Sequence, residues 1–282
     1  GWRTPRDQGG YQERLGRALW PGVAPGGALP AEQEPDLSGF RRAVWVERAR
    51  IALRELLPQR LGGGSVLVTA AELSDLAEAI FEVLLAEASR HGARRCGAPL
   101  RADGRASSLV VLGMGKLGGR ELNAGSDVDV IFFYDTDDGG GETSLHEHWA
   151  RVAQRVTAAM DEPTADGQVW RVDLRLRPEG SRGPLVNSLG AAERYYETWG
   201  RLWERAALLR ARPIAGDRAL GAQLDAEIVT PFVYRRTVDP TIAAALADLV
   251  VRSRVELSSD PARDLRLGPG GIREAEFFVQ TL

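Results

Sequence analysis

Two aspartates at the start of an apolar segment constrain this chain more than any other feature. Between Val110 and Tyr134 the residues predict a strand, a glycine-rich turn, a short helical turn, a tight Gly-Ser turn and a second strand. Asp127 and Asp129 open the second strand, and side chains at positions i and i+2 of a strand lie on the same face. The sequence therefore places two carboxylates next to each other at the start of a strand.

This carboxylate pair is unfavourable unless a partner neutralises it. Two like charges about 4 Å apart repel by about 4 kcal/mol at an effective dielectric constant of about 20. Mg²⁺ takes oxygen ligands and is commonly bound by one or two carboxylates together with substrate phosphates. Gly125 and Ser126, just before the pair, can bring backbone N–H groups against a phosphate. The alternative is a pair of solvated aspartates at a strand end.

A third carboxylate follows in a segment of strict alternation. Residues 168–178 predict a half-buried strand with one apolar and one polar face. The polar face carries Asp173 among Arg171, Arg175 and Arg177. Guanidinium groups match phosphate geometry in a bidentate fashion, although the same pattern also fits an ordinary solvated face with ion pairs. Together, the three aspartates and the arginines indicate phosphoryl or nucleotidyl transfer on two metal ions.

The choice of basic residues singles out Lys116, which is the one lysine among 36 basic residues. It lies in a glycine-rich run that includes Gly113 and Gly118. A compact ammonium group on a flexible stem is a point-charge contact for a phosphate. The alternative is chance, because a single lysine has to lie somewhere.

The run from Gly113 to Asp129 ends in Gly-Ser-Asp-Val-Asp, which resembles the signature of nucleotidyltransferases with the polymerase-beta-like fold. As a whole, the run is similar to the glutamine synthetase adenylyltransferase family, and the resemblance covers about residues 40–282. The resemblance continues through residues 172–180, 183–186, 203–205, 231–236 and 270–280. The last two of these segments resemble the N-terminal, adenylyl-removing half of that bifunctional family.

The resemblance implies an α+β fold, in which a nucleotidyltransferase core with a small mixed sheet is flanked by helical segments. We expect a mostly helical segment over residues 1–104, the catalytic core over 105–190 and a second helical segment over 191–282. The chain begins without methionine and stops inside an apparent helix. We therefore expect a fragment of a longer protein, truncated at its C-terminus.

The family implies phosphorolytic removal of AMP from a tyrosine of glutamine synthetase, which releases ADP. Asp127 and Asp129 would bind two Mg²⁺ ions, and Asp173 would complete the catalytic site. The predicted nucleotide- and phosphate-binding residues are Gly113, Lys116, Gly118, Gly125, Ser126, Arg175, Arg177 and Arg273. The implied partners are glutamine synthetase and a nitrogen-signalling protein of the PII type.

Two other functions remain open. The related half of such an enzyme attaches AMP from ATP to glutamine synthetase, and the carboxylates alone do not decide the direction. A non-catalytic module that binds glutamine synthetase or a nitrogen-signalling protein is the second alternative.

Composition narrows the class of protein further. The net charge is −3 over 282 residues, so no basic surface for nucleic acid or a membrane is indicated. No apolar run approaches the length of a membrane span and no signal peptide is evident, which predicts a cytoplasmic protein. The single cysteine, Cys96, cannot form an internal disulfide.

Helical patterns fill most of the remaining chain. A helix over 38–57 is predicted to bury Val44, Ile51, Leu53, Leu56 and Leu57. Further helices are predicted near 9–19, near 143–160, after Ser188 until Pro213, and from Asp239-Pro240 to Leu257.

Four local interpretations accompany these helices. Thr69-x-x-Glu72 is interpreted as a capping box for a helix that ends at His91-Gly92. His146 and His148 diverge on a helix and are expected at the surface. A stripe of aromatic side chains is expected in the core, and Glu204 and Arg205 are candidates to face the cleft. The stripe consists of Tyr195, Tyr196, Trp199, Trp203 and Leu208. The glycine-rich turn before Ile272 is expected to present free N–H groups to an anion.

Overall fold

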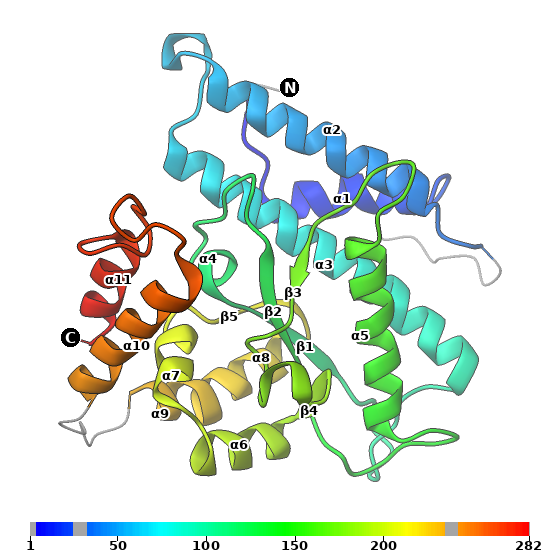
Figure 1. Ribbon diagram of the computed structural model, residues 1–282. Helices are drawn as coiled ribbons and strands as arrows, with labels where there is room; N and C mark the ends of the chain where they lie inside the picture. Colours follow the sequence, from blue (N-terminus) through cyan, green and yellow to red (C-terminus); the bar gives the residue numbers. More distant parts are fainter. Residues whose placement is uncertain (1–3, 25–32, 235–241, 282) are drawn as a thin grey trace.

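A small mixed β-sheet lies at the centre of the protein (Figure 1). The structure is a computed structural model that describes residues 4–24, 33–234 and 242–281. Within these residues, five strands run in the order β3-β2-β1-β5, with β4 also paired to β2. The strands are β1 (Leu109–Gly113), β2 (Val128–Tyr134), β3 (Val172–Asp173), β4 (Val186–Ser188) and β5 (Arg212–Gly216).

Strand β2 organises the sheet. β1 is antiparallel to it, whereas β3 and β4 are both parallel to it. β3 lies beside residues 128–129 and β4 beside residues 132–134, so the two short strands share one edge of β2. This register places Asp129 directly opposite Asp173. The predicted α+β class with a small mixed sheet is confirmed.

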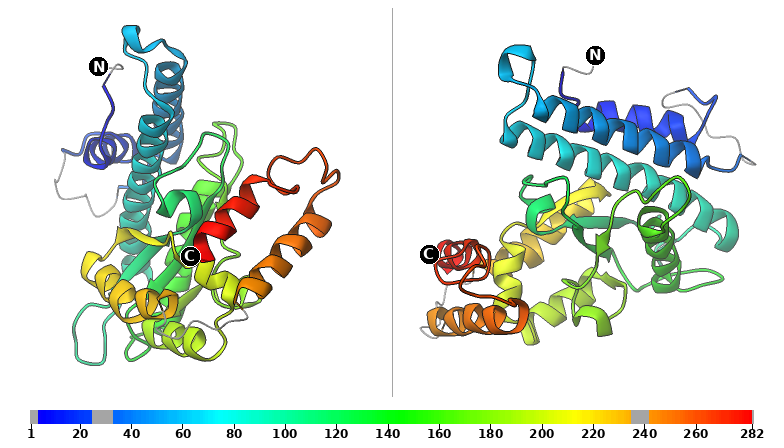
Figure 2. Two further views of the ribbon diagram at one scale, coloured as in Figure 1. Left: turned by 90° about the vertical axis from the view of Figure 1, so that its left-hand side faces the viewer. Right: turned by 45° about the horizontal axis from the view of Figure 1, so that its top comes forward.

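Helices cover both faces of the sheet (Figures 1 and 2). Alternate residues of β2 point to opposite faces, and both sets are buried. Val130 and Phe132 belong to a core shared with α3 (Val66–Cys96) and α5 (Leu145–Asp161). Ile131 and Phe133 belong to a second core on the other face. Its helices are α6 (Leu189–Thr198), α7 (Leu202–Leu208), α8 (Arg218–Leu224), η3 (Asp225–Val229) and α9 (Thr230–Val233).

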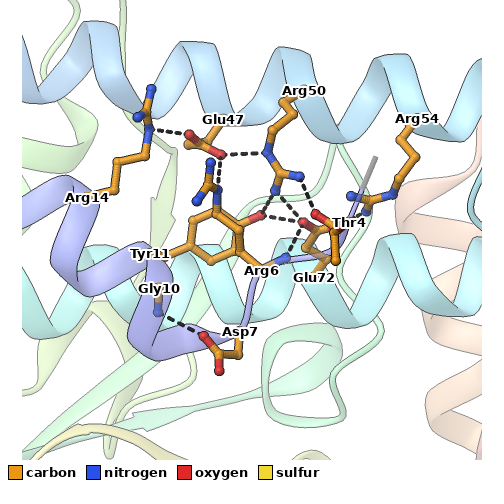
Figure 3. Close-up of polar contacts among 10 residues, drawn as sticks. All are labelled: Thr4, Arg6, Asp7, Gly10, Tyr11, Arg14, Glu47, Arg50, Arg54 and Glu72. Carbon is orange, nitrogen blue, oxygen red and sulfur yellow. Dashed lines mark hydrogen bonds and ion pairs between the residues drawn. The ribbon is translucent and has the colours of Figure 1, made fainter. Parts of the chain in front are cut away.

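An N-terminal helical layer lies on the outer side of α3. It consists of α1 (Gln8–Leu19), α2 (Leu37–Leu56) and the short turn η1 (Gln59–Leu61). Ionic groups are buried among the three helices (Figure 3): Glu47, Arg54 and Glu72 are each at most 2% exposed. Buried charges are tolerated where they pair, and Arg54 forms an ion pair with Glu72.

Arg50 and Tyr11 complete this buried cluster (Figure 3). Arg50 Nε donates to Glu47 Oε2 at 2.7 Å, and the Tyr11 hydroxyl donates to Glu72 Oε1 at 2.7 Å. Arg50 also forms an ion pair with Glu72. The cluster therefore ties α1, α2 and α3 together through polar contacts.

The predicted apolar face of α2 is only partly correct. Val44 and Ile51 are buried, but Leu53 is 61% exposed and Leu56 is 82% exposed. The inward face of α2 combines apolar residues with charged residues of the buried cluster, such as Arg50. The apolar leucines therefore face outward.

The prediction for the long helix α3 is wrong at both ends. It begins at Val66, one turn before Thr69, and the Ser65 Oγ accepts from the Val68 N–H as the N-cap. Glu72 is accordingly a buried ion-pair partner rather than part of a capping box. The helix continues through Gly92 to Cys96.

His148 also differs from the prediction, because it is 3% exposed rather than on the surface. A Cβ at Gly92 would lie 3.3 Å from the His148 ring. His146 is exposed, as expected. The helix that carries both, α5, buries Trp149, Val152 and Met160 behind the sheet, as the sequence predicts.

The continuous helix predicted after Ser188 is interrupted. α6 ends before Gly200, where a Cβ would lie 2.4 Å from the Phe232 ring, and α7 (Leu202–Leu208) follows. Pro213 does not end a helix but belongs to β5, an edge strand, where a residue without an N–H is acceptable. Of the predicted core stripe, Tyr196 and Leu208 are buried, but Trp199 is 72% exposed.

The last helices stand beside α7 (Figures 1 and 2). They are α10 (Ile242–Leu257) and α11 (Ile272–Thr281). The predicted helix start at Asp239-Pro240 lies outside the described residues. None of the helices that the structure describes combines the length and apolar character needed to cross a membrane.

Candidate functional site

Two carboxylates from adjacent strands face each other at the beginning of β2. Asp129 and Asp173 are direct partners in the parallel register. Burial, together with the negative charges of Asp173 and Asp127, raises the pKa of Asp129 to about 6. Hydrogen bonds from Arg175 lower the pKa of Asp173. One carboxylate of the pair is thus stabilised as an anion, while the charges of Arg175 and Lys116 only partly offset the raised pKa of the other.

Asp127 is arranged differently from Asp129. Its Oδ1 lies 2.5 Å from Arg171 Nη2, and the Arg171 side chain is exposed. Among the described residues, no three His, Cys, Asp or Glu side chains form a metal-binding group by themselves. Asp129 and Asp173 nevertheless fit one divalent cation, because a cation would remove the repulsion that raises the pKa of Asp129. Asp127 could join them only after leaving Arg171.

The Gly-Ser turn before β2 is held by contacts from three directions. Lys116 Nζ donates to Ser126 Oγ at 3.2 Å, so the single lysine reaches the turn. Trp170 Nε1 donates to the Ser126 carbonyl at 2.8 Å. Arg48 of α2 donates to the Ala124 carbonyl at 3.0 Å. The N-terminal helical layer, for which the sequence indicated no chemistry, therefore helps to position this turn.

A cleft of about 520 Å³ opens beside the carboxylates. Asp129 and Asp173 lie on its sheet side, and Trp203 of α7 also lines it. Its remaining wall comes from the C-terminal helices and the segments before β5 and α11. This wall carries Arg210, Arg266 and Arg273. Volumes of this size are typical of sites for small-molecule ligands.

The three arginines of this wall differ in their partners. Arg210 Nη1 lies 3.2 Å from Glu121 and 3.6 Å from Glu276. Burial lowers the pKa of Arg273, as expected for a guanidinium that lacks full solvation. Glu276 lines the same wall, so the arginines left to stabilise an anion in the cleft are Arg266 and Arg273.

Comparison with known proteins identifies the family of this chain. The family model described as glutamate-ammonia ligase adenylyltransferase matches residues 28–227. This chain belongs to that family. The match includes the glycine-rich run, the paired aspartates and strand β3.

Curated relatives in this adenylyltransferase family extend the comparison. A bifunctional glutamine synthetase adenylyltransferase/adenylyl-removing enzyme of Thioalkalivibrio sulfidiphilus is 45% identical over 83% of this chain. Proteins with the same name are 44% identical over 92% of the chain in Burkholderia pseudomallei and 42% identical over 94% in Chromobacterium violaceum. The chain covers 24%, 29% and 28% of these three relatives, so it spans about a quarter of their length.

The glycines of the run have different surroundings in this member of the adenylyltransferase family. A Cβ at Gly118 would lie 1.9 Å from the Arg210 carbonyl oxygen, and one at Gly113 would lie 2.7 Å from Ile214. Both positions are therefore explained by close packing, whereas a Cβ at Gly125 would meet nothing within 4 Å. Whether any of them binds phosphate remains a prediction.

The predicted phosphate-binding arginines also differ in their hydrogen-bond partners. Arg175 Nε donates to both carboxylate oxygens of Asp173, at 3.0 and 2.9 Å, and lines the cleft. Arg177 instead donates to backbone carbonyls, including Leu174 at 2.8 Å and Pro184 at 3.0 Å. These bonds assign Arg177 to holding the loop after β3, and they do not favour its predicted contact with phosphate.

Two expectations about the helical segments are wrong. The first N–H groups of α11 are not free, because Ile272 and Arg273 donate to the carbonyls of Leu265 and Arg266. Glu204 is buried and turned away from the cleft, because it accepts from the Tyr195 hydroxyl and the Arg201 N–H.

Sequence reasoning missed several residues that line the cleft. Gly115 has a positive φ of 52°, and a Cβ there would lie 3.2 Å from Asp129 Oδ2. Its place between Gly113 and Lys116 was a usable signal, since a glycine run permits close approach. Arg210 and Arg266 carried no such signal, because the chain is rich in arginine and their neighbours are distant in sequence.

Proposed function

We propose that this chain carries an adenylyl-removing activity on glutamine synthetase. Inorganic phosphate attacks the phosphorus of a tyrosine-linked AMP, a P–O bond to phosphate forms, and the P–O bond to tyrosine breaks. The products are ADP and a tyrosine whose oxygen takes up a proton. The observation that supports this most directly is the Asp129–Asp173 pair, which faces a wall of three arginines across one cleft.

In this proposal, different residues bind the cation and the nucleotide phosphate. Asp129 and Asp173 would hold a divalent cation such as Mg²⁺, joined by Asp127 once it leaves Arg171. When bound, such a cation supplies positive charge at the oxygens of the reacting phosphorus. Lys116, Ser126 and the turn around them would bind nucleotide phosphate.

The resemblance of residues 231–236 and 270–280 to the adenylyl-removing half supports this direction of reaction. Phosphorolysis also requires a free phosphate to bind in the cleft beside the nucleotide phosphate. Arg210, Arg266 and Arg273 line the cleft opposite the carboxylates, and Arg266 and Arg273 are candidates to bind that phosphate. ATP-dependent adenylylation is the alternative reaction for the same carboxylates, and binding of glutamine synthetase without catalysis is the second alternative.

A labelling experiment tests this proposal. The chain is incubated with adenylylated glutamine synthetase, Mg²⁺ and labelled inorganic phosphate, and ADP is separated. Label is expected in ADP, and Asp129→Asn should remove it while the protein stays folded. Transfer of AMP from ATP to unmodified synthetase, with no labelled ADP, would instead identify the adenylylating reaction.

A further inference from the structure

A second hollow lies beside the cleft and has no role in the function proposed above. It has a volume of about 740 Å³ and shares Arg175 with the cleft. Its other sides come from the loop at residues 179–182 and from α6 and the start of α7. We call it the arginine pocket and define it by Arg175, Arg182, Tyr195, Trp199 and Arg201.

The walls of the arginine pocket are held in place by hydrogen bonds. The loop side is fixed by Arg177, whose guanidinium donates to backbone carbonyls before and after the loop. On the helical side, the Tyr195 hydroxyl donates to the buried Glu204 at 2.9 Å, and Glu204 accepts from the Arg201 N–H at 2.7 Å. A site that is formed before binding loses little conformational entropy when it binds.

The chemistry of the pocket is cationic and aromatic. Arg182 and Arg201 are exposed, and neither guanidinium has a carboxylate partner among the described residues. Glu179 is the one acidic residue in the lining of the described pocket. Trp199, predicted for the core, is 72% exposed instead. Exposed tryptophan and arginine side chains are the types that contribute most to protein interfaces.

We propose that the arginine pocket binds an acidic polypeptide segment next to the modified tyrosine of the protein substrate. This proposal rests on the function proposed above. Because Arg175 borders both hollows, a chain whose tyrosine enters the cleft places its neighbouring residues at the pocket. Carboxylates of that segment would pair with Arg182 and Arg201, and an apolar side chain would cover Trp199.

Open, exposed arginines favour a polypeptide over a nucleotide in this pocket. Charges at an exposed rim steer a partner and set specificity, and their effect weakens as salt increases. The cleft already supplies less solvated groups beside the carboxylates, such as Arg273. The less exposed cleft would therefore bind the reacting phosphates, and the more exposed arginine pocket would bind the protein that carries them.

The test is a binding measurement that requires no catalysis. Unmodified glutamine synthetase is passed over the immobilised chain without phosphate or Mg²⁺, at low and high salt. The Arg182→Glu/Arg201→Glu variant should bind about tenfold more weakly or worse at low salt, and the difference should shrink at high salt. Trp199→Ala should also weaken binding, but with little dependence on salt.

A matched control separates the pocket from net charge. Arg60 and Arg218 are exposed and lie outside both hollows, so Arg60→Glu/Arg218→Glu makes the same change in charge. This control should bind like the original chain, and all variants should unfold at the same temperature. Equal binding by the pocket variant and the control overturns the proposal, as does absence of binding by the original chain.

The same variants distinguish the pocket from the proposed function. Binding without label in ADP would leave the pocket standing and reject the phosphorolytic reaction. Loss of ADP affinity in the pocket variant, with binding of the synthetase retained, would identify a nucleotide site and overturn the pocket proposal.

Discussion

At the scale of single residues, Asp127 and Asp129 are not equivalent. Strand alternation predicted their common side but not their partners, since those come from residues distant in sequence. Arg171 pairs with Asp127, whereas Asp129 faces a second carboxylate. Like-charge repulsion therefore concentrates on Asp129, and so does its effect on stability.

Asp129→Asn should stabilise the metal-free chain at pH 7.5 but not at pH 4.5. The pKa of Asp129 is raised from 3.8 to about 6 in the folded state, so the folded state holds the proton more tightly than the unfolded one. The contribution to folding is complete below about pH 4 and is lost as pH rises through 6. Asparagine cannot ionise, so the variant avoids this loss of stability at pH 7.5. Urea unfolding at the two pH values, in the presence of a chelator, measures the free energy of unfolding of both proteins.

Asp127→Asn serves as the comparison for this experiment. Its carboxylate already pairs with an exposed arginine, so the change should cost between zero and about 1 kcal/mol at pH 7.5. Equal stabilisation by both variants would contradict the asymmetry described here.

Residue-scale prediction from the sequence succeeded where the spacing was local. Lys116 and Ser126 were each singled out from the local sequence, although their contact was not predicted. The sequence grouped Asp173 with Asp127 and Asp129, whereas its position opposite Asp129 depends on the pairing of two strands. The role of Arg177 could not be foreseen, because a guanidinium can donate to backbone carbonyls as well as to phosphates.

At the scale of elements, the glycine run is a packing device as much as a loop. Gly118→Ala should destabilise the chain by about 1–3 kcal/mol, because backbone atoms of Arg210 would have to move. Gly125→Ala is the matched control, since its Cβ would meet nothing within 4 Å. Thermal unfolding of the two variants checks this, and an equal loss in both would argue against the packing role.

The helix α2 shows where patterns of apolar residues mislead. Its periodicity predicted buried Leu53 and Leu56, yet both are exposed, and the inward face carries charged residues that pair with α1 and α3. Strand β5 was also missed, because Pro213 ordinarily ends a helix and gives no sign of an edge strand.

Glu72→Gln should destabilise the chain by about 3–5 kcal/mol. It leaves Arg50 and Arg54 buried without their shared counter-charge. The exposed pair of Glu13 and Arg17 provides the control, and Glu13→Gln should change stability by less than about 1 kcal/mol. Urea unfolding of both variants measures the difference, and a small effect at Glu72 would show that the cluster contributes little.

At the scale of the whole molecule, the cleft exists because distant segments meet. Its carboxylates come from the sheet, and its arginines come from the segments before β5 and α11 and from α11 itself. The sequence indicated each helix but not how α10 and α11 stand against α7. Neither the shape of the cleft nor the arginine pocket beside it was therefore predictable from local patterns.

Arg210 links the two sides of the cleft through Glu121 and Glu276. Arg210→Ala should let α11 open more often, so its amides should exchange hydrogen faster by up to about fivefold, while those of β1 and β2 should not change. Arg252→Ala is the control, since its partner Asp248 lies within the same helix. Equal hydrogen-exchange rates of the α11 amides in both variants would mean that this link does not hold the two sides of the cleft together.

The inverted faces of α2 have a consequence for mutational tolerance. In most surface helices, outward positions accept almost any residue and inward positions accept only apolar ones. Here polar residues can replace the outward Leu53 and Leu56. Replacing the inward Arg50 or Arg54, even by lysine, would disturb the contacts among three helices. A saturation library of this helix would therefore retain arginine and glutamate where a hydrophobicity scale expects leucine.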